Sequence, residues 1–184
     1  MARPVIAIVG RPNVGKSTLF NKLVGERISI VDDTPGVTRD RIYGKVEWLD
    51  KTADIIDTGG IEPYSDDIIL KQMRRQAELA IDAADVIILV TDLKSGLVTT
   101  DIEVATMLQK SGRPVVLCVN KCDRIGEPDP GFYEFYNLGL GDPIQVSSVH
   151  GHGTGDLLEA VFSHIPDSAW EDNAGAVIDV AVIG

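Results

Sequence analysis

Residues 10–17, GRPNVGKS, decide the fold. They match the pattern GxxxxGK[ST], in which glycines let the backbone curl so that several N–H groups point at phosphate oxygens. A short β-type run, residues 5–9, precedes this stretch, and residues 17–24 have the pattern of a helix that Gly25 ends. Because the motif requires a strand before it and a helix after it, the sequence predicts a nucleotide phosphate as the ligand of this turn.

The side chains and amides of this turn have distinct predicted tasks. Lys16 places a full charge between the β- and γ-phosphates, and the Ser17 hydroxyl is a ligand for Mg²⁺, which needs hard oxygen ligands. The helix start adds the positive end of its dipole. The other nucleotide-binding positions that we expect here are Gly10, Asn13, Val14, Gly15 and Thr18.

Strands and helices alternate along the rest of the chain. Residues 86–90 and 115–119 are continuous apolar runs, typical of strands buried on both faces of a parallel sheet. Residues 42–49 alternate with period two, and residues 53–56 follow after Asp50 and Lys51, which predicts an antiparallel hairpin. Further predicted elements are helices over 67–84, 100–110 and 155–165 and a short strand over 143–146. The pattern predicts an α/β fold with a mostly parallel sheet, flanked by helices, and one antiparallel edge strand.

The stretch Asn120-Lys121-Cys122-Asp123, at the end of the run 115–119, indicates which base is bound. A carboxylate only accepts hydrogen bonds, and guanine presents N1–H and its 2-amino group to Asp123 as adjacent donors. Adenine has neither donor and would leave a desolvated carboxylate unpaired, which is costly. Asn120 and Lys121 are expected to complete the base site. Three residues after the next predicted strand, where backbone N–H groups can meet guanine O6, are also expected there: Ser147, Ser148 and Val149.

Three further positions are candidates for the γ-phosphate and the metal. Asp57 follows the predicted strand 53–56 and is expected to hold Mg²⁺ through water. Gly60 has no side chain, so its N–H can approach a γ-phosphate. Thr38 is the remaining candidate Mg²⁺ ligand. Both Thr38 and Gly60 lie in stretches without a clear period, and long irregular loops in a compact α/β domain are typically functional.

Taken in order, GRPNVGKS, Thr38, DTGG (57–60), NKCD (120–123) and SSV (147–149) resemble the motifs of translation-factor-class GTPases. The combination of GRPNVGKST, TPGVTRD and DTGGIE is similar to the Der (EngA) family, among its Era and TrmE relatives. This resemblance implies a Ras-like G domain of the P-loop NTPase class. It also implies binding of GTP or GDP with Mg²⁺ and slow hydrolysis of GTP, with catalytic contacts from Lys16, Thr38, Gly60 and Asn13.

Two residues set the expected mechanism apart from that of Ras. Ile61 stands where many Ras-like GTPases have a glutamine that orients the attacking water, and isoleucine cannot hydrogen-bond water. In TrmE-like relatives an asparagine at the position of Asn13 helps to hold K⁺ beside the phosphates, so the resemblance implies K⁺ as a further cofactor. Asn13 is equally consistent with a loop residue that caps its own backbone. Arg39 and Arg41 are interpreted as solvated loop charges rather than an arginine finger.

The resemblance also carries a domain prediction. Residues 180–184 (VAVIG) repeat the pattern of residues 6–10 (IAIVG). We therefore expect a G domain over 1–166, an acidic linker over 167–176, and over 177–184 the first strand of a second G domain that is truncated here. The expected partners are that second domain, a K-homology-like domain and, through the whole protein, the large ribosomal subunit during its assembly.

The composition of the chain argues against several other classes of protein. The net charge is −11, and the positive charges are scattered, so direct nucleic-acid binding by this segment is not expected. No apolar run is long enough for a membrane span, and the N-terminus has no signal-peptide pattern, which predicts a cytoplasmic protein. Cys118 and Cys122 are expected to be reduced structural thiols, and His150 and His152 lack the partners of a metal site.

Two alternatives to a GTP-hydrolysing switch remain. In the first, the chain is a nucleotide-dependent interaction module with negligible turnover, in which GTP sets the surface shown to a partner. In the second, it is a P-loop kinase that transfers phosphate to a small molecule, against which Asp123 and the lack of an Arg-rich lid segment argue. Turnover of GTP with and without K⁺ separates the GTP-hydrolysing switch from the interaction module. Transfer of phosphate to an acceptor other than water would favour the kinase.

Overall fold

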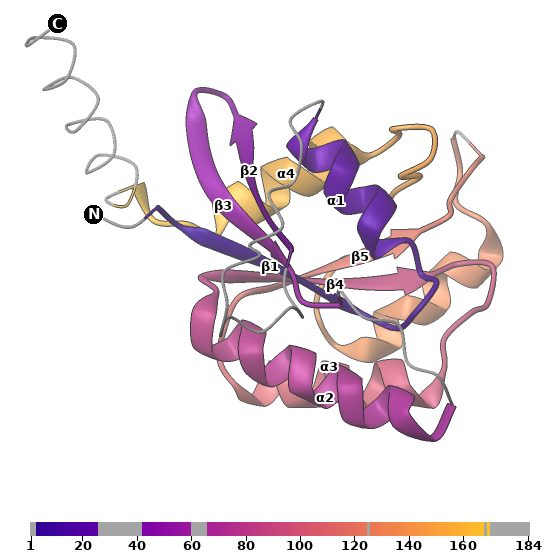
Figure 1. The fold of residues 1–184 in the computed structure, drawn as a ribbon. Helices are drawn as coiled ribbons and strands as arrows, with labels where there is room; N and C mark the ends of the chain where they lie inside the picture. The colour runs from indigo at the N-terminus through magenta and orange to yellow at the C-terminus, as the bar shows by residue number, and fades with distance from the viewer. Residues whose placement is uncertain (1–2, 26–41, 60–65, 125, 168, 170–184) are drawn as a thin grey trace, which may run out of the picture.

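The computed structural model describes residues 3–25, 42–59, 66–124, 126–167 and 169 (Figure 1). Several predictions lie outside these residues: those for Thr38, Gly60, Ile61 and the two loop arginines, and those for most of the acidic linker and the repeated strand over 177–184.

A six-stranded sheet forms the middle layer, in the order β2-β3-β1-β4-β5-β6. The strands are β1 (Val5–Gly10), β2 (Ile42–Trp48), β3 (Lys51–Asp57), β4 (Val86–Asp92), β5 (Val115–Asn120) and β6 (Ile144–Gln145). All neighbours pair in parallel except β2, which runs antiparallel to β3 at one edge. The predicted α/β fold with an antiparallel edge strand is confirmed.

Helices cover both faces of this sheet. Helices α1 (Lys16–Val24) and α4 (Thr154–Ser163) lie on one face, and α2 (Asp66–Ala83) and α3 (Thr99–Lys110) lie on the other (Figure 1). Each helix turns its apolar stripe to the sheet, as Leu19, Phe20 and Leu23 of α1 show, because residues three and four apart share a helix face. The chain thereby forms a buried core on each side of the sheet.

The structure corrects two local predictions. The hairpin turns at Leu49 and Asp50, one residue earlier than predicted, and both residues have positive φ (49° and 64°). Such a two-residue turn matches the right-handed twist of the flanking strands. A 3₁₀ helix, η1 (Pro130–Leu138), occupies a stretch for which no element was predicted. It begins where the Asp129 side chain accepts a hydrogen bond from the Gly131 N–H at 3.1 Å.

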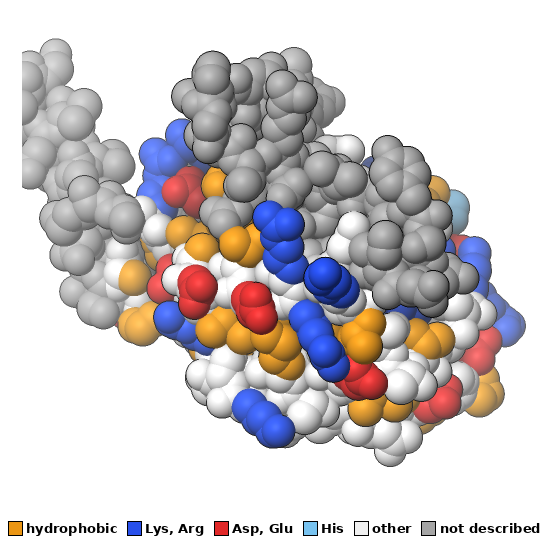
Figure 2. All heavy atoms as spheres, turned by 60° about the horizontal axis from the view of Figure 1, so that its bottom comes forward, with side chains coloured by type: hydrophobic (Ala, Val, Ile, Leu, Met, Phe, Trp, Pro, Cys, Tyr) orange, Lys and Arg blue, Asp and Glu red, His pale blue; other side chains and the backbone are white. Residues whose placement is uncertain are grey.

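The outer surface over α2 and α3 carries mixed charges (Figure 2). The exposed side of α2 carries Lys71, Arg74 and Arg75, and Arg74 pairs with Glu103 of α3 at 3.3 Å. Figure 2 shows such basic side chains beside acidic and apolar ones. Within the described part of the chain, no helix combines the length and apolar character that a bilayer crossing requires.

One edge of the sheet gathers the predicted motifs. Because β1, β3, β4, β5 and β6 run in parallel, their carboxyl ends meet at the same edge. These ends are Gly10, Asp57, Asp92, Asn120 and Gln145. In open α/β sheets, ligands bind outside this edge.

Candidate nucleotide-binding site

The turn between β1 and α1 has the curled backbone that its sequence predicts. Asn13 and Gly15 both have positive φ (67° and 96°), and Gly15 is the N-cap of α1. A Cβ on Gly15 would lie 2.3 Å from Nδ2 of Asn120, and one on Gly10 would lie 2.7 Å from the Val90 carbonyl oxygen. Neither glycine can be replaced without moving its neighbour, so close packing fixes the path of this loop.

The Lys16 side chain lies inside the loop. It is buried, with 6% of its surface exposed, and its ammonium donates to the carbonyl oxygens of Gly10 at 2.6 Å and Arg11 at 2.8 Å. A Cβ on Gly59 would lie 2.3 Å from Lys16 Cε, so this glycine, for which no role was predicted, makes room for the lysine stem. The charge is thus held where the loop N–H groups converge.

Asp57 is the carboxylate next to the loop. It is fully buried; Oδ1 accepts from the Gly59 N–H at 3.0 Å, and Oδ2 has no hydrogen-bond partner among the described residues. Burial raises the pKa of Asp57, against the opposing effects of the Gly59 N–H, the Lys16 charge and a hydrogen bond from Ser17. A buried carboxylate oxygen without a partner, close to a hydroxyl, is the kind of donor set that suits Mg²⁺.

Asn120 joins the phosphate loop to the segment after β6. Its Nδ2 donates to the Val14 carbonyl at 2.8 Å and to Ser148 Oγ at 3.0 Å, and its Oδ1 accepts from the Ser148 N–H at 3.0 Å. The side chain is 1% exposed. Both amide protons are therefore used within the protein, and the side chain links the phosphate loop to the segment after β6.

Lys121 makes the second link to the phosphate loop. Its ammonium donates to the Asn13 carbonyl at 2.7 Å and to Asp92 Oδ2 at 2.7 Å. Burial acts to raise the pKa of Asp92, but the hydrogen bond and charge of Lys121, with the N–H groups of Lys94 and Ser95, bring that pKa below its ordinary value. Asp92 was not predicted as a site residue, although its position at the end of a buried strand indicates a place at this edge of the sheet.

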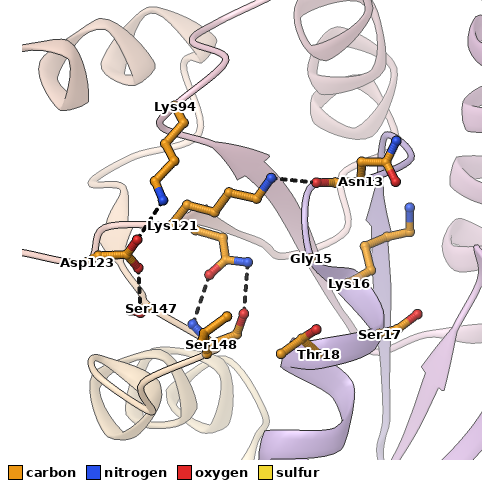
Figure 3. Close-up of a pocket in the computed structure, with 12 residues that line it drawn as sticks. Asn13, Gly15, Lys16, Ser17, Thr18, Lys94, Lys121, Asp123, Ser147 and Ser148 are labelled. Atoms are coloured by element: carbon orange, nitrogen blue, oxygen red, sulfur yellow. Dashed lines mark hydrogen bonds and ion pairs between the residues drawn. The ribbon is translucent and has the colours of Figure 1, made fainter.

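Asp123 is held by two partners on two different loops. Oδ1 accepts from Ser147 Oγ at 2.9 Å, and Oδ2 pairs with the Lys94 ammonium at 2.7 Å (Figure 3). The hydrogen bond from Lys94 is the largest influence that lowers the pKa of Asp123, followed by that from Ser147. The carboxylate is therefore ionised at neutral pH. Sequence reasoning missed Lys94, which no motif includes.

A cavity of about 500 Å³ connects these groups. It is lined by Asn13, Gly15, Lys16, Ser17, Thr18, Lys94, Asn120, Lys121, Asp123, Ser147, Ser148 and Val149. Of the other predicted positions, Gly10, Val14 and Asp57 do not line the cavity, whereas Thr38 and Gly60 fall outside the described residues. The cavity runs from a lysine held by the phosphate loop to an ionised carboxylate, which matches the two ends of a nucleotide.

Arg11 of the loop points to a different place. Its Nε donates to Asp101 Oδ1 at 2.9 Å and its Nη2 to Ser95 Oγ at 3.1 Å. Asp101 is fully buried and also accepts from the Val98 N–H at the start of α3. Arg11 therefore anchors the loop to α3 and is not part of the cavity lining.

The fold and this site define a P-loop GTPase domain. Residues 5–121 match the family described as 50S ribosome-binding GTPase, and the chain belongs to that family. It is similar over its whole length to GTPase Der of Ruminiclostridium cellulolyticum, with 63% identity, and to GTPase Der of Acetivibrio thermocellus, with 60% identity. The resemblance to the Der family that the motifs indicate is confirmed. The chain spans 42% of the length of each of these relatives.

Solved structures of other GTPases share the fold. Aquifex aeolicus Era, in a variant bound to GDP and AlF₄⁻, has a TM-score of 0.70 at 29% identity, over 90% of this chain and 58% of that one. The G domain of the T. maritima FeoB iron transporter has a TM-score of 0.67 at 28% identity, over 89% of this chain and 99% of that one. The Ras-like G-domain architecture is thus shared with proteins of low sequence identity.

Proposed function

We propose that this chain is a Mg²⁺-dependent guanine-nucleotide-binding domain that hydrolyses GTP and acts as a slow switch. The observation that carries the proposal is the single cavity that joins Lys16, Ser17 and the ionised carboxylate of Asp123. A family match over residues 5–121 and the similarity to GTPase Der support the same function.

The nucleotide would lie along this cavity with its phosphates at the loop. The loop amides from Gly10 to Thr18 and the Lys16 ammonium would hold the phosphates, with Lys16 exchanging its carbonyl partners for phosphate oxygens. Asp123 would accept the two donors of guanine, and the N–H groups of residues 147–149 would meet O6. Asn120 and Lys121 would stabilise the base site through their hydrogen bonds to the phosphate loop.

The residues present fit a Mg²⁺ ion beside the phosphates. Ser17 would be a direct ligand, and Asp57, whose Oδ2 has no partner among the described residues, would hold the ion through water. Thr38 remains the proposed second protein ligand, and Gly60 the proposed amide contact with the γ-phosphate. When bound, the ion neutralises charge on the β- and γ-phosphates, so contacts that depend on the γ-phosphate would distinguish the GTP form from the GDP form.

Potassium is proposed as a second cation, held with the help of Asn13. This residue is exposed, lines the cavity and has a left-handed backbone. Its backbone carbonyl accepts a hydrogen bond from the Lys121 ammonium at 2.7 Å, which holds the residue beside the cavity. A cation at this place would stabilise negative charge that develops between the β- and γ-phosphates, where Ile61 offers no hydrogen bond to water.

Hydrolysis of GTP in K⁺ or Na⁺ tests this function. We expect phosphate release that requires Mg²⁺ and is about tenfold faster in K⁺ than in Na⁺, which corresponds to ~1.4 kcal/mol in the transition state. Asn13→Ala should remove the K⁺ preference and leave GDP affinity nearly unchanged, because Lys16 and the loop amides still hold the phosphates.

The outcomes of this assay separate the hypotheses. Equal rates in K⁺ and Na⁺ would contradict the cation proposal alone. Guanine nucleotide binding without measurable turnover would favour the alternative of a nucleotide-dependent interaction module. An ATP turnover equal to that of GTP would contradict the proposed function itself.

The partners of the whole protein follow from the relatives. Because the chain spans 42% of the length of the Der proteins that it matches, we propose further domains in the whole protein, a second G domain and a K-homology-like domain. Action in assembly of the large ribosomal subunit, in the cytoplasm, is proposed from the resemblance to Der and from the family description. Co-sedimentation of the full-length protein with large subunits in GTP and GDP tests this.

A further inference from the structure

The Lys94–Asp123 ion pair lies at the base end of the cavity. Lys94 comes from the loop after β4, Asp123 from the segment after β5 and Ser147 from the segment after β6. The Lys94 ammonium and the Ser147 hydroxyl take one carboxylate oxygen each, at 2.7 and 2.9 Å (Figure 3). Three loops from three parallel strands therefore converge on one carboxyl group.

Both partners of Asp123 are themselves anchored. The Lys94 N–H donates to Asp92 Oδ1 at 2.8 Å, which fixes the start of the lysine side chain. Ser147 is 1% exposed, and its backbone exchanges two hydrogen bonds with that of His152, at 2.9 and 3.1 Å. Ser147 is therefore a fixed anchor for one oxygen, whereas the Lys94 side chain is 64% exposed and is held at its backbone and through its ammonium; a third of the Asp123 side chain is exposed.

Recognition of guanine needs a fixed carboxylate plane. Guanine presents N1–H and N2–H side by side, so both acceptor oxygens must lie near the plane of the base. The terminal torsion of an aspartate is broad, and a carboxylate with one tether can rotate. Two tethers on opposite oxygens remove that freedom.

The two tethers leave room for the base. Each carboxylate oxygen has about two lone-pair sites, so an ionised Asp123 can accept from Lys94 and Ser147 and still accept one hydrogen bond from guanine on each oxygen. The base and the two tethers can therefore bind the same carboxylate without competing for its lone pairs.

We propose that Lys94 is a positioning residue for guanine recognition, which acts by fixing the plane of the Asp123 carboxylate. This inference rests on the proposed guanine nucleotide binding and adds a residue outside the recognised motifs. Lys94 and Asp123 also line a second cavity of about 350 Å³, so the pair borders both cavities.

The test compares Lys94→Met and Lys94→Arg with the unmutated chain, for GDP, inosine diphosphate and ADP. Inosine diphosphate lacks the 2-amino group and makes one hydrogen bond to Asp123 where GDP makes two. We expect Lys94→Met to weaken GDP binding about three- to tenfold, through faster dissociation, and to weaken inosine diphosphate binding less. Lys94→Arg should restore the ratio of the two affinities, because a guanidinium can also pair with Oδ2.

A control separates this role from the loss of one positive charge. Lys110→Met removes an exposed lysine at the far end of α3 and should leave all three affinities unchanged.

Several results would overturn the proposal. Unchanged or tighter GDP binding by Lys94→Met would mean that the lysine is neutral or competes with the base. An equal loss for GDP and inosine diphosphate would mean that it only attracts nucleotide charge. Failure of the unmutated chain to bind GDP in preference to ADP would contradict the proposed function, and this inference with it.

Discussion

At the scale of single residues, the site depends on carboxylates in opposite environments. Burial raises the pKa of Asp57, whereas the hydrogen bond from Lys94 lowers that of Asp123. The charged form of Asp57 is thus disfavoured by burial, whereas the charged form of Asp123 is stabilised by its two hydrogen-bond donors. The two carboxylates are expected to respond differently to the same Asp→Asn change.

Asp123→Asn should shift base preference from guanine toward xanthine. Xanthine presents a carbonyl at C2, to which the amide N–H of asparagine can donate, whereas guanine presents a donor there. Competition between GDP and xanthosine diphosphate measures the change. Asp129→Asn alters an exposed carboxylate near the second cavity and should keep the preference for GDP. If Asp123→Asn still selects GDP, Asp123 does not read the base.

Asp57→Asn should stabilise the chain without Mg²⁺ and abolish its stabilisation by Mg²⁺. A carboxyl group with a raised folded-state pKa favours folding fully below its unfolded pKa of about 3.9 and loses that contribution as pH rises through the folded pKa. Asparagine does not ionise, so the variant loses no stability as the pH rises, and its side-chain oxygen can still accept the hydrogen bond from the Gly59 N–H. The gain should therefore be absent near pH 3 and grow as the pH rises above about 4.

Urea unfolding over a pH series, with and without Mg²⁺, measures this gain. Glu159→Gln, which changes an exposed carboxylate on α4, is the matched control and should show neither effect. An Asp57→Asn variant that is less stable than the parent at pH 7 without Mg²⁺ would contradict the account of this carboxylate.

At the scale of elements, the β2–β3 hairpin carries local backbone strain. Leu49 and Asp50 both have positive φ, and for leucine this conformation costs roughly 1–2 kcal/mol. Asn-Gly is the preferred pair for such a two-residue turn. We expect the double variant Leu49→Asn, Asp50→Gly to raise the free energy of unfolding by about 1 kcal/mol.

Denaturant unfolding checks the hairpin prediction. Leu49→Val is the opposite control, because a β-branched residue tolerates positive φ worst, and it should destabilise the chain. Leu49 is 74% exposed, so neither change removes buried contacts. A double variant of lower stability than the parent would mean that this turn is not strained.

At the scale of the whole molecule, the sequence predicted those features of the fold that follow from local patterns of residues. Alternation of apolar runs with helical stretches predicted the sheet, and the loop and base motifs fell at one edge because parallel strands end there. Contacts between distant residues could not be predicted. Arg11 meets Asp101 across 90 positions of sequence, and Asn120 meets Val14 across 106. The Lys94–Asp123 pair is a further contact of this kind, since only the fold brings the two loops together.

We propose that one cavity binds a guanine nucleotide by both its phosphates and its base. Calorimetric titration of the purified chain with GDP and with ADP, in Mg²⁺, measures both contributions. We expect GDP to bind at least about a hundredfold more tightly than ADP, because adenine lacks the two donors that guanine presents to the Asp123 carboxylate. Lys16→Ala should weaken GDP binding by ~1.5–3 kcal/mol, while Lys22→Ala, on the exposed side of the same helix, should not. Equal affinity for GDP and ADP, or GDP affinity unchanged by Lys16→Ala, would contradict the claim.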